Sequence, residues 1–335
     1  MGKIDEMCDK VDQRMQSIDA RIDARIKEID AKIDSSSANV GVQTSASASK
    51  GAGDQRVIVS LLHSAVEASD LVAAACGEKD GSRRLAVSIG LNKVNPAAYQ
   101  GYNIPPLSGC VVDSQRFMCV LERLGFRAIS LLDEKATCAA VHGVLRDVAK
   151  VLQPGDLFVF HISGHGGREL HEGEKQENWC LYDGAVWKDD ILWMFSRFKP
   201  GVRILVINDQ CHSGGIFQPR LIGGLAAFAL LCREDGRPQD WDAESAMNGP
   251  DFPMVIQFAG CRAEQTSIDG LAGGTWTQAL INTLEQVYAR NEDCSYRQWF
   301  DMSFASPTLR RGRQDPQWVE SPQVTDAFRD RQALS

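Results

Sequence analysis

The sequence lacks the long uncharged apolar stretch that a transmembrane helix requires. Its most apolar candidate, residues 57–76, is interrupted by His63, Glu67 and Asp70. The first residues are charged and contain no apolar core of an export signal, so we expect a cytoplasmic protein without a membrane partner. Lysine and arginine (36 residues) are outnumbered by aspartate and glutamate (44), and the net charge of −8 disfavours nucleic acid as a partner.

Paired cysteine motifs are also missing. None of the ten cysteines belongs to a CxxC pair, which is the commonest mark of a structural zinc site. Without an export signal, we expect the cysteines to be reduced thiols rather than a disulfide framework. A reduced thiol is available for catalysis once it loses its proton.

The N-terminal region carries an eleven-residue repeat of apolar side chains. Ile4, Met15 and Ile26 form one series, and two further series run in parallel with it. Such a repeat has about 3.67 residues per turn, which predicts a nearly straight or slightly right-handed coiled coil over residues 1–34. We expect self-association or a partner helix along residues 4–33, with a helix folded back on the main domain as the alternative.

Two further segments separate this repeat from the rest of the chain. Residues 35–54 are rich in Ser, Ala and Gly without periodicity, which predicts a flexible linker. Residues 55–84 are predicted to be an accessory helical segment.

Apolar strands alternate with helices from residue 85 to residue 330. Strands are predicted at 85–91, 126–132, 156–162, 202–208 and 254–259, and helices at 107–124, 136–152, 187–198 and 275–290. This alternation predicts an α/β fold with a mostly parallel sheet covered by helices on both faces. Sites in such sheets form beyond the carboxyl ends of the strands.

Two glycine-rich polar clusters follow the third and fourth strands. Ser163-Gly-His-Gly-Gly167 ends the third strand, and Asp209-Gln-Cys-His-Ser-Gly-Gly215 ends the fourth. If these strands are parallel neighbours, His165 and Cys211 emerge at the same edge. An imidazole can take the proton of a thiol and return it to a leaving amine. The backbone N–H groups of Gly166 and Cys211 are then candidates for stabilising an oxyanion.

Other readings of these residues have less support. A zinc site made of His161, His165, Cys180 and Cys211 would need four side chains to converge. Gly164, Gly166 and Gly167 do not complete the GxGxxG pattern of a dinucleotide-binding loop. A single buried cysteine is usually part of a core, but two such clusters at matching strand ends favour catalysis.

Segments spread over residues 85–267 resemble metacaspases, and more closely their prokaryotic relatives, the orthocaspases. The matching segments are Leu107-Ser-Gly-Cys-Val-Val-Asp113, Phe158-Val-Phe-His-Ile-Ser-Gly-His-Gly-Gly167, Leu181-Tyr-Asp-Gly184, Asp189-Asp190, Asp209-Gln-Cys-His-Ser-Gly-Gly215 and Gly260-Cys-Arg-Ala-Glu-Gln-Thr-Ser267, followed by the helix that contains Gln278-Ala-Leu280. The resemblance implies a six-stranded caspase-type sheet and a cysteine endopeptidase with His165 and Cys211 as its dyad. It also implies a large part at about 85–219, a linker at about 220–250 and a small part at about 251–330.

The resemblance implies cleavage after Arg or Lys in protein or peptide substrates. The family's acidic specificity pocket maps onto Asp113 and Asp209, with Cys110 and Ser163 beside them. Two carboxylates in a closed pocket attract a cationic side chain and repel an anionic one. For Asp113 alone, a charge at a helix N-terminus is the simpler interpretation.

The resemblance implies no cofactor for the chemistry and a calcium ion as activator. Asp183, Asp189 and Asp190 match three of the family's calcium-binding aspartates, but the fourth matching position is Gln218. The alternative is that Asp189 and Asp190 only favour a helix N-terminus. Self-cleavage is expected in the linker, where the basic points are Arg220, Arg233 and Arg237.

Two other functions compete with the peptidase. One is a non-catalytic caspase-like scaffold assembled through the coiled coil, which the presence of both His165 and Cys211 disfavours. The other is a clostripain-like or separase-like thiol peptidase, which the GCVVD and DQCHSGG segments disfavour.

Overall fold

The computed structural model describes residues 83–99, 102–171, 174–211, 213–217, 237–238, 241–262, 273–307, 309 and 314–335. The predicted coiled coil, the flexible linker and nearly all of the accessory segment lie outside these residues. Within the described residues, no helix combines the length and the apolar character needed to cross a bilayer.

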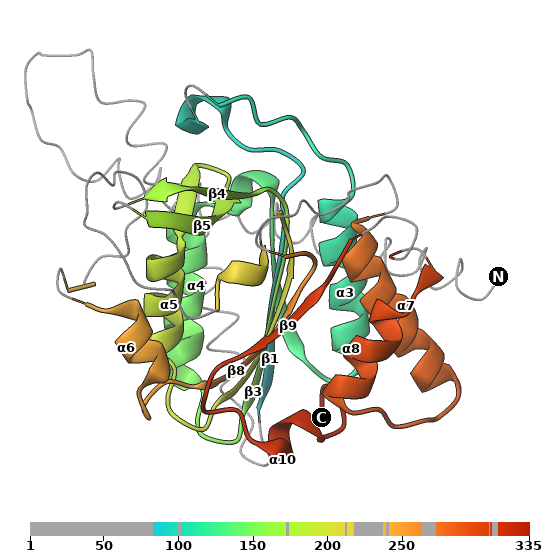
Figure 1. The fold of residues 1–335 in the computed structure, drawn as a ribbon. Helices are drawn as coiled ribbons and strands as arrows, with labels where there is room; N and C mark the ends of the chain where they lie inside the picture. Colours follow the sequence, from blue (N-terminus) through green and yellow to red (C-terminus); the bar gives the residue numbers. More distant parts are fainter. Residues whose placement is uncertain are drawn as a thin grey trace, which may run out of the picture. The chain divides into compact units, whose positions relative to one another are not determined.

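The centre of the fold is a six-stranded sheet (Figure 1). In spatial order its strands are β2 (Arg127–Leu132), β1 (Arg84–Gly90), β3 (Leu157–Ser163), β7 (Arg203–Asp209), β8 (Met254–Ala259) and β9 (Gln317–Glu320). The first five are parallel, and β9 is antiparallel to β8. Every residue of β3 and β7 is buried, as expected for parallel strands covered on both faces. The predicted mostly parallel, six-stranded sheet is confirmed.

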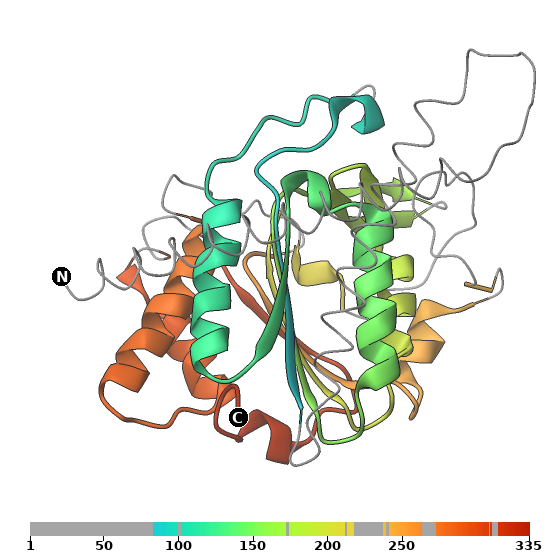
Figure 2. The same ribbon diagram turned by 180° about the vertical axis from the view of Figure 1, so that it is seen from behind.

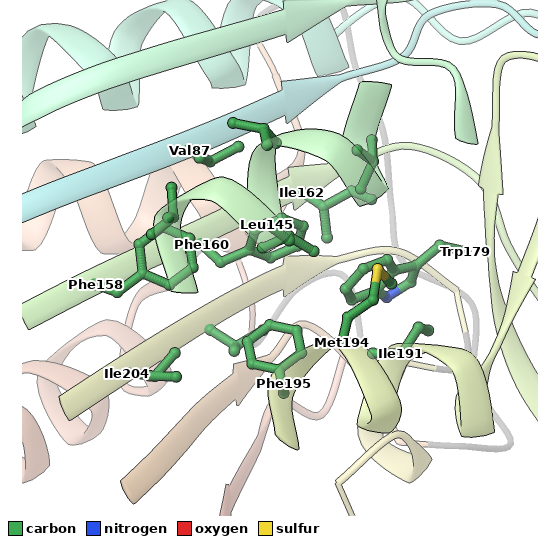
Figure 3. Close-up of a cluster of buried hydrophobic side chains, with 14 of the residues drawn as sticks. Val87, Leu145, Phe158, Phe160, Ile162, Trp179, Ile191, Met194, Phe195 and Ile204 are labelled. Atoms are coloured by element: carbon green, nitrogen blue, oxygen red, sulfur yellow. The ribbon is translucent and has the colours of Figure 1, made fainter. Parts of the chain in front are cut away.

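Helices cover both faces of this sheet (Figures 1 and 2). One face carries α4 (Cys138–Val151), α5 (Lys188–Ser196) and α6 (Ala243–Asn248), and the other carries α3 (Cys110–Arg123), α7 (Thr275–Ala289) and α8 (Tyr296–Phe304). Each face has its own hydrophobic core. In the core beneath α4 and α5, Phe160 stacks on Trp179 at 5.0 Å between ring centroids, and Phe195 meets Phe160 edge-on (Figure 3). Burying each such ring stabilises the fold by about 1.5–3 kcal/mol.

Two helix starts are capped by residues close to them in the sequence, and a third is capped by a distant residue. The Thr137 hydroxyl accepts the Ala140 N–H at the start of α4, and Ser295 and Gln298 form a reciprocal capping box at the start of α8. The α3 start depends on Asn92, whose side-chain oxygen accepts the first backbone N–H groups of the helix.

A small antiparallel sheet lies between β3 and α5, and sequence patterns did not predict it. It consists of β4 (Gly166–His171), β5 (Glu174–Leu181) and β6 (Gly184–Trp187). Because β4 begins at Gly166, this sheet starts within the first glycine-rich cluster, at the residue after His165. It therefore fixes the direction in which the chain leaves His165.

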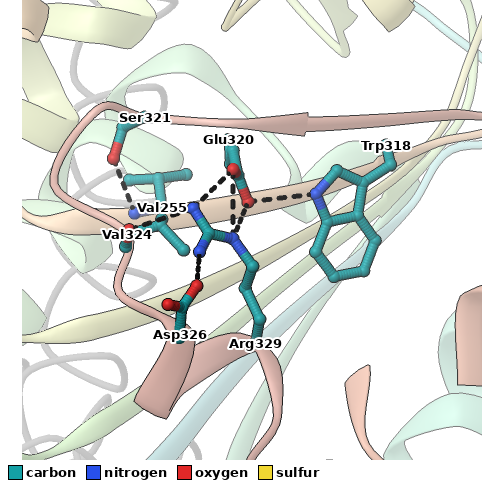
Figure 4. A network of polar contacts seen from close by, with 7 residues as sticks. All are labelled: Val255, Trp318, Glu320, Ser321, Val324, Asp326 and Arg329. Carbon is teal, nitrogen blue, oxygen red and sulfur yellow. Dashed lines mark hydrogen bonds and ion pairs between the residues drawn. The ribbon is translucent and has the colours of Figure 1, made fainter. Parts of the chain in front are cut away.

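The C-terminal helix α10 (Asp326–Arg329) is fastened to the edge strand β9 by an ion pair (Figure 4). Arg329 donates to both carboxylate oxygens of Glu320 at 2.8–3.1 Å and to the Val324 carbonyl at 3.2 Å. Trp318 donates from its indole nitrogen to the same carboxylate at 3.1 Å. These bonds hold α10 against the edge strand.

Candidate active site

Two loops meet at the carboxyl edge of the central sheet. The strands β3 and β7 are parallel neighbours, and Ser163 pairs with Asp209 in their register. His165 and Cys211 each follow these paired residues by two positions. The expectation that the third and fourth core strands lie side by side is confirmed, and the shared register places both residues at one edge.

The backbones of the two loops are in direct contact. Gln210 donates from Nε2 to the carbonyl oxygen of His165 at 2.6 Å, and the Cys180 N–H donates to the same oxygen at 3.1 Å. A Cβ added at Gly166 would clash with the carbonyl oxygen of Cys211, so this close approach requires glycine. The structure therefore brings together His165, Gly166 and Cys211.

The imidazole of His165 is oriented by a backbone carbonyl that sequence reasoning missed. Its Nε2 lies 2.7 Å from the carbonyl oxygen of Pro105. Because a carbonyl only accepts, Nε2 carries a proton, which leaves Nδ1 as the ring nitrogen that can exchange a proton with a neighbouring group. Both His165 and Cys211 are partly exposed, which leaves them accessible to a substrate.

The loop that carries Cys211 is held on both sides. The buried Cys261 thiol lies 3.4 Å from the carbonyl oxygen of Gln210, the residue before Cys211. On the other side, Gln257 donates to the Ser213 carbonyl at 3.0 Å. A side chain on a loop held in this way keeps its position while a ligand binds.

The four residues predicted for the specificity pocket lie at the same edge. Asp113 is fully buried, Asp209 is 4% exposed, and Cys110 is buried one turn before Asp113 on α3. Ser163 donates from its hydroxyl to Asp113 Oδ2 at 2.8 Å. A Cβ added at Gly274 would lie 2.9 Å from Asp113 Oδ2 and would clash with the Asp209 carboxylate. Both carboxylates therefore lie against the backbone of Gly274.

The first turn of α7 supplies hydrogen bonds to both carboxylates, which sequence reasoning also missed. The Gly274 N–H donates to Asp113 Oδ2 at 2.8 Å, and the Gln278 side chain donates to Asp113 Oδ1 at 2.7 Å. The Thr277 N–H donates to Asp209 Oδ2 at 2.9 Å. Carboxylates are favoured at a helix N-terminus. The glycines before residue 275 were the available signal, because they let other groups approach the helix start.

The two carboxylates influence each other's ionisation. Burial, followed by the charge of Asp209, raises the pKa of Asp113 from 3.8 to about 7, although three hydrogen bonds oppose the rise. With no cation bound, Asp113 therefore takes up a proton at a higher pH than an exposed aspartate does. A guanidinium or ammonium group at this place would favour the ionised pair.

The residues predicted for calcium are not brought together. The described part of the chain contains no group of three His, Cys, Asp or Glu side chains suited to a metal ion. Asp183 accepts the Cys138 N–H at 2.7 Å at the start of α4. Asp190 pairs with the Arg237 guanidinium at 2.9 Å, and Asp189 lies 4.0 Å from it. These residues do not fit a calcium ion, and Gln218 lies outside the described residues.

The zinc alternative fails for the same reason. His161 is fully buried between Ser88 and Thr277, with ring nitrogens 2.8 and 3.2 Å from their hydroxyl oxygens. It therefore does not join His165 in a metal site.

Comparisons with known proteins agree with this geometry. The Caspase domain family model matches residues 83–328. Metacaspase-2 of Trypanosoma brucei brucei is 29% identical over 247 residues, which cover 63% of this chain and 65% of the relative. Metacaspase-1 of Yarrowia lipolytica is 27% identical over 248 residues, which cover 57% of this chain and 53% of the relative. The chain thus spans less than two thirds of the length of these curated relatives.

A solved structure shows the same fold. The crystal structure of protein GSU0716 from Geobacter sulfurreducens superposes with a TM-score of 0.60 and 25% sequence identity, covering 76% of this chain and 98% of that chain. With a family model that matches most of its length, the chain belongs to the caspase-domain family of cysteine peptidases, in which the relatives described above are metacaspases.

Proposed function

We propose that the chain is a cysteine endopeptidase that cleaves after Arg or Lys, with Cys211 as nucleophile and His165 as acid–base partner. The observation that carries this proposal is the contact between the two loops, which start from paired positions of β3 and β7. The acidic pair Asp113–Asp209 at the same sheet edge supports the preference for a basic residue.

The chemistry follows from the orientation of the imidazole. With Nε2–H bonded to the Pro105 carbonyl, Nδ1 takes the proton of the Cys211 thiol, and the thiolate attacks the carbonyl carbon of the substrate. The N–H groups of Gly166 and Cys211 are our candidates for stabilising the resulting oxyanion. The imidazolium then protonates the leaving amine. Water, deprotonated by His165, hydrolyses the thioester and regenerates the thiol.

The specificity follows from the acidic pair. A cationic side chain placed against Asp113 and Asp209 restores the charge balance of two buried carboxylates. An aspartate side chain there would add a third negative group and is rejected by like-charge repulsion.

A panel of fluorogenic peptides tests the proposal. Peptides ending in Arg, Lys, citrulline or Asp are given to the full chain, to Cys211→Ala and to Cys119→Ala as a matched control. Cys119 is a partly buried cysteine of α3, an element that does not carry Cys211. We expect wild type and Cys119→Ala to cleave the Arg and Lys peptides and Cys211→Ala to cleave none. Preference for the Asp peptide, or full activity of Cys211→Ala, would refute the proposal.

Three expectations from the sequence remain predictions. Calcium stimulation, which the pairing of Asp190 with Arg237 disfavours, is tested by titrating activity with calcium and a chelator. Self-cleavage is tested by intact mass after incubation, with Cys211→Ala as control. Self-association through residues 4–33 is tested by comparing the oligomeric state of the full chain with that of a chain starting at residue 35.

A further inference from the structure

A chain of buried hydrogen bonds runs beneath the acidic pair. The Ser114 and Ser88 hydroxyl oxygens are 2.8 Å apart, and Ser88 lies 2.8 Å from Nδ1 of His161. On the other side of the ring, Nε2 lies 3.2 Å from the Thr277 hydroxyl oxygen. All four side chains are fully buried. This network of hydrogen bonds therefore connects α3, β1, β3 and the first turn of α7.

Two members of this network, Ser114 and Thr277, are next to the two carboxylates, and Ser114 also lies 3.2 Å from the Ser130 hydroxyl oxygen of β2. Ser114 follows Asp113 on α3, and the Thr277 N–H donates to Asp209 Oδ2. The same turn of α7 also supplies the Gly274 N–H to Asp113. The place of this turn relative to the sheet thus sets where both carboxylates lie.

His161 is poorly explained by packing alone. It lies in β3, where every residue is buried, and an aliphatic side chain would fill such a position. Burial lowers the pKa of His161 to about 3, so the ring is neutral and has one N–H donor and one acceptor. Hydroxyl groups on both sides satisfy these two nitrogens. A satisfied buried network of this kind holds its members in one arrangement.

We infer that His161 is a positioning residue of the basic-side-chain pocket. Through the Thr277 hydroxyl it ties the first turn of α7 to the sheet, and that turn orients the Asp113 and Asp209 carboxylates. This inference rests on the proposed function, because it concerns recognition of a cationic side chain at the same site.

Kinetics of Thr277→Val in the full chain test the inference. Valine keeps the shape of threonine and the backbone N–H to Asp209 but removes the bond to His161. We expect the KM of an Arg-ended peptide to rise about tenfold, equivalent to about 1.4 kcal/mol, while kcat and the kcat/KM of the matched citrulline peptide stay within about threefold. Thr277→Ser, which keeps the hydroxyl, restores the wild-type KM.

A matched control separates this effect from general damage to α7. Thr283 is on the same helix, and its hydroxyl donates only to the Ala279 carbonyl one turn earlier. Thr283→Val is expected to leave both peptides unaffected. Should Thr277→Val not fold, Ser88→Ala removes the other partner of His161, and a KM rise of about threefold is expected.

The outcomes distinguish the inference from the proposed function. A wild type that does not prefer the Arg peptide over citrulline overturns the proposed specificity. A selective wild type with unchanged KM in Thr277→Val, or in Ser88→Ala if that variant stands in, overturns the role of His161. Equal losses on both peptides also overturn it, because the network would then serve the fold rather than the pocket.

A separate observation concerns the pair Asp189–Asp190 at the start of α5. The Arg237 side chain, 5% exposed, reaches Asp190 at 2.9 Å, and the Asp190 side chain is 4% exposed. Trp241 packs edge-on against Trp193 of α5 at 5.4 Å between ring centroids. Residues 237 and 241 are thus both fixed to the same helix.

We propose that Arg237 is the resident counter-ion of this acidic pair, in place of a metal ion. An ion pair from which water is excluded must stay paired, since an isolated buried charge costs several kcal/mol. Two consequences follow. The carboxylates have their cation without a divalent ion, and the peptide bond after Arg237 resists self-cleavage because the guanidinium is not available to the specificity pocket.

Thermal unfolding of Arg237→Gln tests this second proposal, with Arg197→Gln as the matched control. Arg197 is the exposed C-cap residue of α5, and its guanidinium packs over Trp193. We expect a Tm loss of several degrees in Arg237→Gln, partly recovered in Arg237→Gln/Asp190→Asn, and about one degree or less in the control. Calorimetric titration with calcium should not reveal a binding site that is present in wild type and lost in Asp190→Asn. In addition, no chain end should form after Arg237. Such binding, cleavage there or an unchanged Tm would overturn the proposal.

Discussion

Replacing Asp209 with asparagine removes one of the two charges that face a basic side chain while keeping the shape of the residue. The amide oxygen can still accept the Thr277 N–H that now donates to Asp209 Oδ2. The helix start therefore keeps its hydrogen bond, and the change acts mainly on charge.

The size of the effect follows from burial. Asp209 is 4% exposed, so solvent screens its charge weakly. Breaking one side of a desolvated charge pair costs about 2–5 kcal/mol. Because Asp113 remains as a second carboxylate, we expect about 2–3 kcal/mol, which is a fall of about 30- to 150-fold in kcat/KM for an Arg peptide.

The pH dependence gives a second, independent signature. Ionising Asp113 at a pKa of about 7 instead of 3.8 corresponds to about 4 kcal/mol, caused first by burial and second by the Asp209 charge. In wild type, the Arg-to-citrulline ratio of kcat/KM should fall as pH falls through about 7, because protonated Asp113 no longer attracts the cation. In Asp209→Asn, the fall should move to lower pH, but not as low as 3.8, since burial remains.

The assay is the kcat/KM of matched Arg and citrulline peptides between about pH 5 and 9. Using the ratio cancels the ionisation of Cys211 and His165, which affects both peptides equally. An equal loss on both peptides would refute the recognition role of Asp209. A ratio that does not change with pH in wild type would refute the raised pKa of Asp113.

Two further predictions concern loop contact and stability. Gly166→Ala places a Cβ against the Cys211 carbonyl, so kcat/KM should fall about 100-fold or more on every peptide while the Tm drops by a few degrees; wild-type activity would show that the loops need no such contact. Arg329→Gln removes the ion pair with Glu320, whose pKa is lowered because hydrogen bonds from Arg329 and Trp318 outweigh burial. Both side chains are about a third exposed, so urea unfolding should show a loss of about 0.5–1 kcal/mol at neutral pH. The loss should begin to shrink as pH falls below about 4.5 and disappear once pH is below the lowered pKa of Glu320, where the folded carboxylate becomes neutral; a loss that persists there would point to packing instead.

The parallel core was predictable because buried strands are continuous apolar runs. β8 was predicted at its observed bounds, and β1, β3 and β7 within one residue at each end. The predicted start of α3 at Leu107 was three residues early, since Asn92, distant in sequence, caps the helix at Cys110. The strands β4 to β6 were missed because polar residues such as Arg168 and Glu177 interrupt any apolar pattern.

The candidate site was likewise predictable from the sequence only in part. His165 and Cys211 were predictable as neighbours, because parallel register carries two strand ends to one edge. The Pro105 carbonyl and the first turn of α7 were not, since backbone groups leave no residue type to recognise. Arg237 was interpreted as a cleavage point, and only the fold reveals its pairing with Asp190.

Covalent labelling tests the role of Cys211 most directly. The full chain is treated with an Arg-ended chloromethyl ketone, and the adduct is located by peptide mass spectrometry. We predict one adduct, on Cys211, that forms at least about 100-fold more slowly in His165→Ala. An adduct on another cysteine, or an unchanged rate in His165→Ala, would contradict the Cys211–His165 pair.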